Sequence, residues 1–210
     1  MSKEMLWLFD LDDTLYGPTA PYREVVVRRM ELSVYSRGLC APGKYEERGG
    51  ELRRIWKTDD TTLAFALEHG IDFDELMSDV YDGIAMTNIP IRLRPGVEAI
   101  KHLPGVKGVF SNAPHRRIRD ILQHFNISAL FNVIHGVAPN ARVGKPHDEA
   151  YVLASNGFEE IAMVEDREEN LLPAVRRGWH CFHLPAAGAT PSRDPRIHVI
   201  DSFSDLLRFV

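Results

Sequence analysis

Two aspartates follow the first apolar run of the chain, in the segment Phe9-Asp10-Leu11-Asp12-Asp13-Thr14-Leu15-Tyr16. In an extended backbone, residues two apart point to the same face, so Asp10 and Asp12 would present their carboxylates together. Such carboxylates repel each other unless a cation lies between them or one is protonated. Hard oxygen ligands of this kind suit Mg²⁺ where a phosphate is nearby. The alternative is a solvated turn with Asx-type caps, which acidic clusters often form.

The pair Ser111-Asn112 follows a second apolar run and precedes a helical pattern. A hydroxyl, an amide and free backbone N–H groups at a helix start would make an anion pocket. The alternative is an ordinary helix N-cap, because Ser and Asn are favoured at that position.

A single lysine stands in the segment Val143-Gly144-Lys145-Pro146-His147. Proline is common in the first turn of a helix, so Lys145 lies between a glycine and an expected helix start. Its ammonium could then project inward as a fixed positive charge. The alternative is a solvated surface lysine, which is the usual state of this residue type.

A second acidic pair, Glu165-Asp166, ends the apolar run from Ile161 to Val164. This arrangement repeats that of Asp10, so the two strand ends could present their acids to one metal ion. The alternative is a helix N-terminus that is enriched in acidic residues to complement the helix dipole.

The elements that must position these groups are visible as short apolar runs, which predict strands buried on both faces of a parallel sheet. The predicted strands cover Met5 to Phe9, Val106 to Phe110, Asn132 to Ile134, Ile161 to Val164, Trp179 to Phe182 and His198 to Ile200. Helical patterns lie between them: three begin near Pro114, after Pro146 and at Phe203, and one around Leu171 ends before Gly178. This alternation predicts βαβ units with right-handed crossovers. Open α/β sheets bind ligands at the carboxyl ends of their strands, where the polar segments above would meet.

One long stretch, from Pro18 to Pro90, contains helical patterns but no convincing buried strand. Phe73, Leu76, Met77 and Val80 recur at helical spacing behind Asp72, a candidate N-cap. The stretch is too long for a simple loop in a compact domain, so it predicts a small helical insertion.

The composition narrows the function classes. The chain has 210 residues, of which 44% are hydrophobic and 26% charged, and this balance predicts a globular protein. The formal net charge of -5 lacks the basic footprint of a protein that binds a nucleic-acid polymer. Two cysteines, Cys40 and Cys181, indicate a reduced, cytoplasmic protein. We expect neither a signal peptide nor a membrane partner, because no apolar run approaches the length of a bilayer span. The sequence does not predict the oligomeric state.

Taken in order, the four polar segments resemble the signature motifs of the haloacid dehalogenase superfamily of phosphohydrolases. Its Asp-x-Asp-x-Thr motif is matched by Asp10 to Thr14, its strand-end hydroxyl by Ser111, its lysine by Lys145 and its acidic pair by Glu165-Asp166. The resemblance covers essentially the whole chain. It implies an α/β fold with a Rossmann-like parallel sheet, helices on both faces and an inserted all-helical cap. The core would comprise residues 1–17 and 91–210, and the cap residues 18–90.

The resemblance also implies roles for the residues. Asp10 would be the nucleophile that forms an aspartyl-phosphate, and Asp12 would act first as general acid and then as general base. Thr14 would orient Asp12 and its turn. The phosphate would be bound by Ser111, Asn112 and Lys145. Mg²⁺ would be held by Asp10, the backbone carbonyl of Asp12, Asp166 and Glu165, with Asn170 as a supporting residue.

Finer features resemble the pyrimidine 5′-nucleotidase branch, including Arg94-Pro95-Gly96, Ser111-Asn112-Ala113 and Gly144-Lys145-Pro146-His147. The fourth motif departs from that branch, which commonly has Asp-Asp where this chain has Glu165-Asp166. The expected function is Mg²⁺-dependent hydrolysis of a small phosphomonoester, with a pyrimidine nucleoside monophosphate as first candidate. Candidates for cap residues that touch the substrate are Arg23, Arg53, Arg54 and Trp56, and the alternative for each is plain surface placement.

Three other functions stay open at this point. The first is a phosphatase for sugar phosphates or phosphoglycolate, because one scaffold serves many substrates. The second is a phosphosugar mutase, in which the phosphoryl group passes to a sugar hydroxyl instead of water. The third is a catalytically silent binding or regulatory protein on the same fold. The complete set of Asp10, Asp12, Lys145 and Asp166 disfavours this last alternative.

Overall fold

Six parallel strands form the central sheet, in the order β5-β4-β1-β6-β7-β8. The computed structural model describes residues 4–17, 20–58, 60–82, 84, 91–137 and 144–210. The strands of the sheet are β1 (Met5–Phe9), β4 (Val106–Pro114), β5 (Val133–Val137), β6 (Glu160–Glu165), β7 (His180–His183) and β8 (Ile197–Val199). Every predicted strand is present, although several ends are shifted. Among them, the last strand begins at Ile197 rather than His198.

Helices cover both faces of this sheet, which confirms the predicted α/β class. They are α5 (His115–His124), α6 (Asp148–Ser155) and α7 (Glu168–Arg176), with the 3-10 helices η2 (Val97–His102), η3 (Ser128–Leu130) and η4 (Phe203–Arg208). Successive residues of β1 point to opposite faces. Trp7 and Phe9 pack in the cluster that contains Ile118 of α5, whereas Leu6 and Leu8 pack with residues of α6 and α7.

Strand β4 differs from the prediction in a way that affects the site. The expected strand stopped at Phe110, with Ser111-Asn112 at the start of a helix. In the structure the strand continues to Pro114, the pairing with β5 shifts register between Phe110 and Pro114, and α5 begins at His115. The side chains of Ser111 and Asn112 are therefore positioned by an irregular strand end and not by a helix N-terminus.

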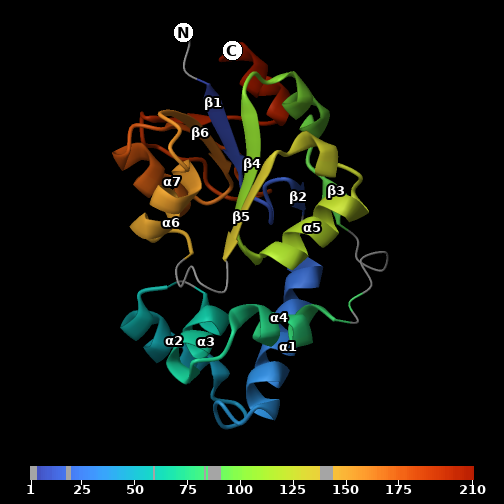
Figure 1. Ribbon diagram of the computed structural model, residues 1–210, viewed down its shortest axis with the longest axis vertical. Coiled ribbons are helices and arrows are strands. Elements are labelled where there is room, and N and C mark those ends of the chain that lie inside the picture. The colour runs from blue at the N-terminus through green and yellow to red at the C-terminus, as the bar shows by residue number, and fades with distance from the viewer. Residues whose placement is uncertain (1–3, 18–19, 59, 83, 85–90, 138–143) are drawn as a thin grey trace.

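A second lobe contains the four helices α1 (Ala20–Ser36), α2 (Tyr45–Trp56), α3 (Thr61–His69) and α4 (Phe73–Tyr81). It lies beyond the carboxyl ends of the strands, at the bottom of Figure 1. The predicted N-cap Asp72 accepts a hydrogen bond from Glu75 N at 3.0 Å. No strand occurs in residues 20–58 and 60–82, as expected for the insertion. Residues 18 and 90 lie outside the described part of the chain, so the division at 17/18 and 90/91 stays a prediction.

A short antiparallel ribbon joins the two lobes, and the sequence did not predict it. It pairs β2 (Tyr16–Gly17), just before the cap, with β3 (Arg92–Leu93), just after it. Arg94 reinforces this junction, because its guanidinium donates to Asp13 O at 3.3 Å and to Pro185 O at 3.0 Å. The two segments that connect the lobes are therefore hydrogen-bonded to each other.

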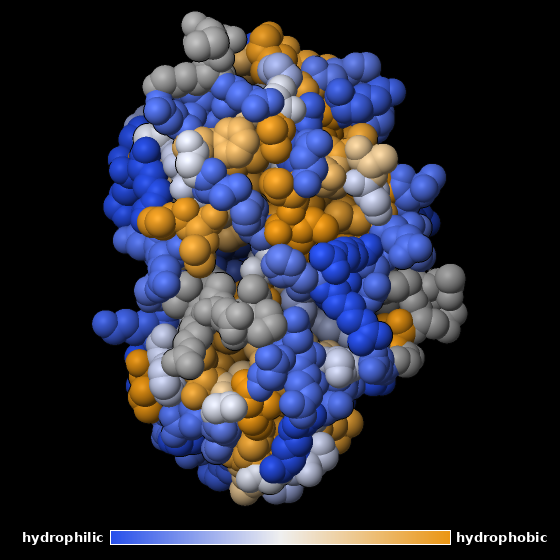
Figure 2. Space-filling view, viewed as in Figure 1, coloured by the Kyte–Doolittle hydropathy of each residue, from blue (hydrophilic) through white to orange (hydrophobic). Residues whose placement is uncertain are grey.

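Each lobe has its own hydrophobic clusters. Two clusters flank the sheet, and one of the two in the cap consists of cap residues alone, such as Val34, Leu52 and Phe65. The remaining cluster belongs to the cap except for Val137 of β5. In the space-filling view, hydrophilic side chains prevail where the lobes meet, whereas an apolar patch lies over α6 (Figure 2). Apolar packing through Val137 therefore joins the two lobes in part.

Two further expectations concern the cysteines and the absence of a helix that could span a membrane. Both cysteines, Cys40 and Cys181, are free, as predicted. None of the helices in the described residues is long and apolar enough to cross a bilayer.

Candidate active site

A cavity of about 730 Å³ lies between the sheet and the cap. Its floor contains the predicted groups at the ends of β1, β4 and β6, together with Lys145. The lining includes the predicted site residues Asp10, Asp12, Ser111, Asn112, Lys145, Glu165, Asp166 and Asn170. The sheet topology explains this convergence, since β4 and β6 are the two neighbours of β1 and run parallel to it.

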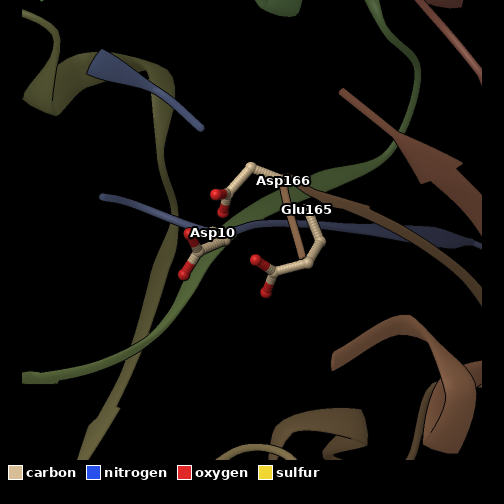
Figure 3. A group of neighbouring side chains, drawn as sticks. All are labelled: Asp10, Glu165 and Asp166. Carbon is tan, nitrogen blue, oxygen red and sulfur yellow. The ribbon is translucent and has the colours of Figure 1, made fainter. Parts of the chain in front are cut away.

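Three carboxylates meet on the cavity floor. Asp10, Glu165 and Asp166 each place an oxygen so that the three atoms lie within 4.8 Å of one another. Figure 3 shows the side chains converging from the end of β1 and from the end of β6. Asp10 and Glu165 are buried, and Asp166 is half-buried.

Lys145 lies against this cluster and is itself almost completely buried. Its ammonium donates to Asp10 Oδ1 at 2.6 Å and to Glu165 Oε2 at 2.5 Å. Burial alone would lower the pKa of the ammonium, but the charges of Asp10 and Glu165 raise it instead. Lys145 is therefore a fixed cation at the site and not a surface lysine.

Asn112 holds the backbone of that lysine. Lys145 N donates to Asn112 Oδ1 at 2.6 Å, and Asn112 Nδ2 donates to Lys145 O at 2.8 Å. Both ends of the amide are thus engaged with the backbone of Lys145, and the phosphate-binding role expected of Asn112 stays a prediction. Ser111 is buried, lines the cavity and accepts a hydrogen bond from Ala113 N at 3.1 Å. Among the described residues its hydroxyl donates no hydrogen bond, so its hydrogen can be given to an acceptor in the cavity.

Thr14 contacts a different carboxylate from the one expected. Instead of orienting Asp12, its hydroxyl donates to Asp166 Oδ1 at 3.2 Å and accepts from Asp166 N at 3.0 Å. His183 supports the same residue from the other side. Its Nδ1 accepts from Ser192 N at 2.9 Å, so Nε2 carries the proton and donates to Asp166 O at 2.7 Å.

Asp12 is oriented by a residue that sequence reasoning missed. The buried hydroxyl of Tyr16 donates to Asp12 Oδ1. Asp12 faces the cavity and is accessible to solvent, yet the surrounding walls remove enough water to raise its pKa, and the Tyr16 hydrogen bond partly opposes this rise. The available signal was a tyrosine four residues after Asp12, just beyond the first motif.

The carboxylates on the floor are protonated more readily than ordinary aspartates. Burial, and then the charge of Glu165, raise the pKa of Asp10 to about 7. Burial, and then the charges of Glu165 and Asp10, raise the pKa of Asp166 to about 9. Both shifts express an excess of negative charge in a space that excludes water.

The residues present fit a divalent cation. The three carboxylates of Asp10, Glu165 and Asp166 against the one ammonium of Lys145 leave two negative charges. Carboxylate oxygens are the ligands that Mg²⁺ prefers. Asn170 adds an independent sign: Nδ2 donates to Glu165 Oε2 at 3.1 Å, while its buried Oδ1 has no hydrogen-bond partner in the described residues. An orphaned buried acceptor beside an acidic cluster suits a water molecule bound to a metal ion.

The cap supplies the opposite wall. Of the predicted cap candidates, Arg23 and Arg53 line the cavity. Arg54 and Trp56 do not line it; both are exposed, and Trp56 Nε1 donates to Glu68 at 3.1 Å. Sequence reasoning missed the other cap residues of the wall, which include Tyr22, Val26, Met30, Tyr45, Glu46, Asp60, Met77 and Tyr81.

Comparison with known proteins gives a family match. The model of the haloacid dehalogenase-like hydrolase family matches residues 5–177, which is most of the chain. No curated protein sequence matches the chain significantly.

Several solved structures share the fold. A predicted phosphoglycolate phosphatase from Haemophilus somnus is 19% identical with a TM-score of 0.61, covering 100% of this chain and 99% of that one. CbbY from Rhodobacter sphaeroides, solved with phosphate, is 20% identical with a TM-score of 0.66, covering 97% and 96%. YfnB from Bacillus subtilis, solved with magnesium, is 13% identical with a TM-score of 0.60, covering 99% of both chains. At these identities the likeness is one of fold.

Proposed function

The chain belongs to the haloacid dehalogenase-like hydrolase family, and from that premise we propose that it is a Mg²⁺-dependent phosphatase that uses Asp10 as a covalent nucleophile. The family match confirms that the chain is a hydrolase, in agreement with the expected class of phosphoric monoester hydrolase. The observation that carries the proposal is the placement of Asp10 on the cavity floor. There its carboxylate contacts Lys145 and lies beside Glu165 and Asp166.

In the first step, an oxygen of Asp10 attacks phosphorus and the bond from phosphorus to the leaving oxygen breaks. Lys145 stabilises negative charge on the attacking carboxylate and the transferring oxygens, because its ammonium is buried where charge is poorly screened. Asp12, with its raised pKa, gives its proton to the leaving alkoxide. The hydroxyl of Ser111, which donates no hydrogen bond within the described part of the chain, would bind a phosphoryl oxygen.

In the second step, water attacks the aspartyl-phosphate. Asp12 takes a proton from that water, and the carboxylate of Asp10 is released with inorganic phosphate. Asp10, Glu165 and Asp166 would hold the metal, with Asn170 beside them. When bound there, Mg²⁺ supplies positive charge that offsets repulsion between Asp10 and the substrate phosphate.

Two substrates are candidates. A pyrimidine nucleoside monophosphate is favoured by the motif resemblance around Ser111-Asn112-Ala113 and Gly144-Lys145-Pro146-His147. Phosphoglycolate is favoured by the name of the Haemophilus somnus protein with the same fold.

The test is phosphate release from a panel that contains UMP, CMP, 2-phosphoglycolate and sugar phosphates, with Mg²⁺ or EDTA. We expect turnover that requires Mg²⁺ and disappears in Asp10→Asn. A labelled phosphosugar that returns as an isomer, without release of phosphate, would instead identify a mutase. Equal turnover by Asp10→Asn and the wild type would refute the nucleophile assignment.

A further inference from the structure

The cap wall of the cavity carries balanced charges. Among the described residues, the charged side chains that the cap contributes to this wall are Arg23, Glu46, Arg53 and Asp60. Two cations and two anions leave no net charge on the wall. The cap therefore offers no general attraction to a second anionic group on a substrate, such as the carboxylate of a phosphorylated acid.

Two of these residues form a polar edge. Asp60 caps α3 by accepting a hydrogen bond from Leu63 N at 2.9 Å, and the positive charge of Arg53 acts on its carboxylate. Both side chains are half-buried. In the described part of the chain, the Arg53 guanidinium makes no hydrogen bond or ion pair within 4.0 Å. Arg53 is thus an available donor beside an acceptor, at the wall of a cavity.

The rest of the cap wall is largely apolar and aromatic. Helices α1 and α4 contribute Tyr22, Val26, Val27, Met30, Met77 and Tyr81. Such a surface packs against carbon atoms or a flat ring. The cap therefore combines an apolar side with a polar edge, as is typical of sites that orient one particular small molecule.

The size of the cavity also favours a substrate larger than a two-carbon phosphorylated acid. A volume of about 730 Å³ lies within the range of about 300–1,000 Å³ for pockets that enclose drug-sized ligands. A two-carbon acid would leave most of this space filled with water.

We propose that the cap half of the cavity is a subsite for an uncharged, hydrogen-bonding leaving group of sugar or nucleoside size, with Arg53 as its donor and Asp60 as its acceptor. This inference rests on the proposed phosphatase function. A carboxylate placed at Arg53 would also meet the negative charge of Asp60, so the subsite disfavours phosphoglycolate. Sugar hydroxyls and the amide edge of a base share the required chemistry.

The experiment compares kcat/KM, with Mg²⁺, for UMP, glucose 6-phosphate, 2-phosphoglycolate and phenyl phosphate. Phenyl phosphate can use the apolar part of the cap wall but not its polar edge, because its leaving group has no further hydrogen-bonding atoms. The variants are Arg53→Gln and Asp60→Asn, which keeps a good N-cap on α3. The control is Arg54→Gln, on the same helix but exposed and away from the cavity.

We expect UMP or glucose 6-phosphate to exceed 2-phosphoglycolate about tenfold or more, the factor that one lost hydrogen bond to a charged group is worth. If UMP is the better of the two substrates, the subsite binds a base, and if glucose 6-phosphate is better, it binds a sugar. Arg53→Gln should lower kcat/KM for that substrate about tenfold more than for phenyl phosphate, and Asp60→Asn should act in the same direction. Arg54→Gln should match the wild type on all four substrates.

Either of two results would overturn the subsite: 2-phosphoglycolate as the best substrate, or an equal loss on all four substrates in Arg53→Gln. A wild type that releases phosphate from none of them, phenyl phosphate included, would refute the proposed function itself. The two failures are therefore distinguishable.

Discussion

Lys145 donates a hydrogen bond of 2.6 Å to Asp10, although the two residues are 135 positions apart in the chain. The same ammonium contacts Glu165 at 2.5 Å. One buried cation therefore offsets part of the charge of two buried carboxylates. The contact links the stability of the site to its chemistry, because the carboxylate that Lys145 neutralises is the proposed nucleophile.

Replacing Lys145 by methionine should destabilise the protein. It leaves Asp10 and Glu165 buried without their counter-charge, and breaking one partner of a buried ion pair costs about 3–5 kcal/mol. We expect the free energy of unfolding in EDTA to fall by about 3 kcal/mol, as measured by urea denaturation. The double variant Lys145→Met with Glu165→Gln should recover part of that loss. If the double variant is no more stable than Lys145→Met alone, uncompensated charge is not the cause of the lost stability.

Stability should also depend on Mg²⁺ and pH together. The pKa of Asp10 is raised to about 7 and that of Asp166 to about 9, whereas unfolded aspartates titrate near about 3.9. Between these values the native protein holds protons that the unfolded chain has lost. The stability contributed by the two groups is therefore full below about pH 4 and is lost as the pH rises toward about 9.

Because metal ligands must be deprotonated, Mg²⁺ should restore this loss most strongly at high pH. We expect the rise in Tm on adding Mg²⁺ to be larger at about pH 8 than at about pH 5.5. Thermal unfolding with EDTA or Mg²⁺ measures it, and Asp166→Asn should abolish most of the rise. An equal rise at both pH values would show that these carboxylates do not hold the ion.

The amide of Asn112 should control activity through Lys145. In Asn112→Ala the backbone of Lys145 loses two hydrogen bonds, of 2.6 and 2.8 Å, so its ammonium is less well placed. We expect kcat to fall about 10–100-fold, the range typical of misplaced catalytic groups, with a smaller change in KM. Steady-state kinetics measure it. The matched control is Asn132→Ala, which removes the side-chain oxygen that accepts a hydrogen bond from Lys107 N at the far end of the sheet. Equal losses in both variants would indicate a general effect on the fold.

Tyr16→Phe should alter the pH dependence of turnover. The Tyr16 hydroxyl donates to Asp12 and holds the pKa of that carboxyl lower than burial alone would. Without the hydroxyl the pKa of Asp12 rises, so the pH at which it becomes able to accept a proton from water moves upward. We expect a lower kcat and an acidic limb shifted to higher pH. Tyr35→Phe is the control, since its hydroxyl accepts from Gly43 N within the cap. An unshifted profile in Tyr16→Phe would remove this role.

Much of the fold could be predicted because the buried strands appear in the sequence as uninterrupted apolar runs. The runs in β1 and β6 are buried on both faces, so they contain no polar interruption. The end of β4 was missed because Ser111 and Asn112 continue the strand with polar side chains. The ribbon of β2 and β3 was missed because two residues on each side carry no periodic pattern.

The site, like the fold, was predicted only in part. Residue types and their places at strand ends predicted which groups meet, but not which atoms bond. Thr14 was assigned to Asp12, its neighbour in the motif, whereas its partner Asp166 lies 152 positions away. Such pairings depend on the order of strands in the sheet, and no local spacing encodes that order.

A buried arginine, Arg117, lies at the junction of the lobes. Arg117 of α5 donates to the hydroxyl of Tyr22 in α1. Its guanidinium also lies 4.9 Å from the ring centre of Tyr22 and 4.6 Å from that of Tyr81 in α4. A desolvated cation–π contact is worth about 2 kcal/mol. Arg117 therefore holds two cap helices against the core beside the cavity.

Arg117→Met should loosen the cap without unfolding the core. Losing about 2 kcal/mol at the junction should speed hydrogen exchange about 30-fold in α1 and α4, with β1 and β6 still protected. The matched control is Arg116→Met, which removes an exposed ion pair of 3.3 Å with Asp82 of the cap. Exposed pairs contribute about 0–1 kcal/mol, so this control should differ little from the wild type. Faster exchange throughout the sheet in Arg117→Met would mean that the arginine supports the whole fold, and unchanged exchange in α1 and α4 would mean that it does not hold the cap.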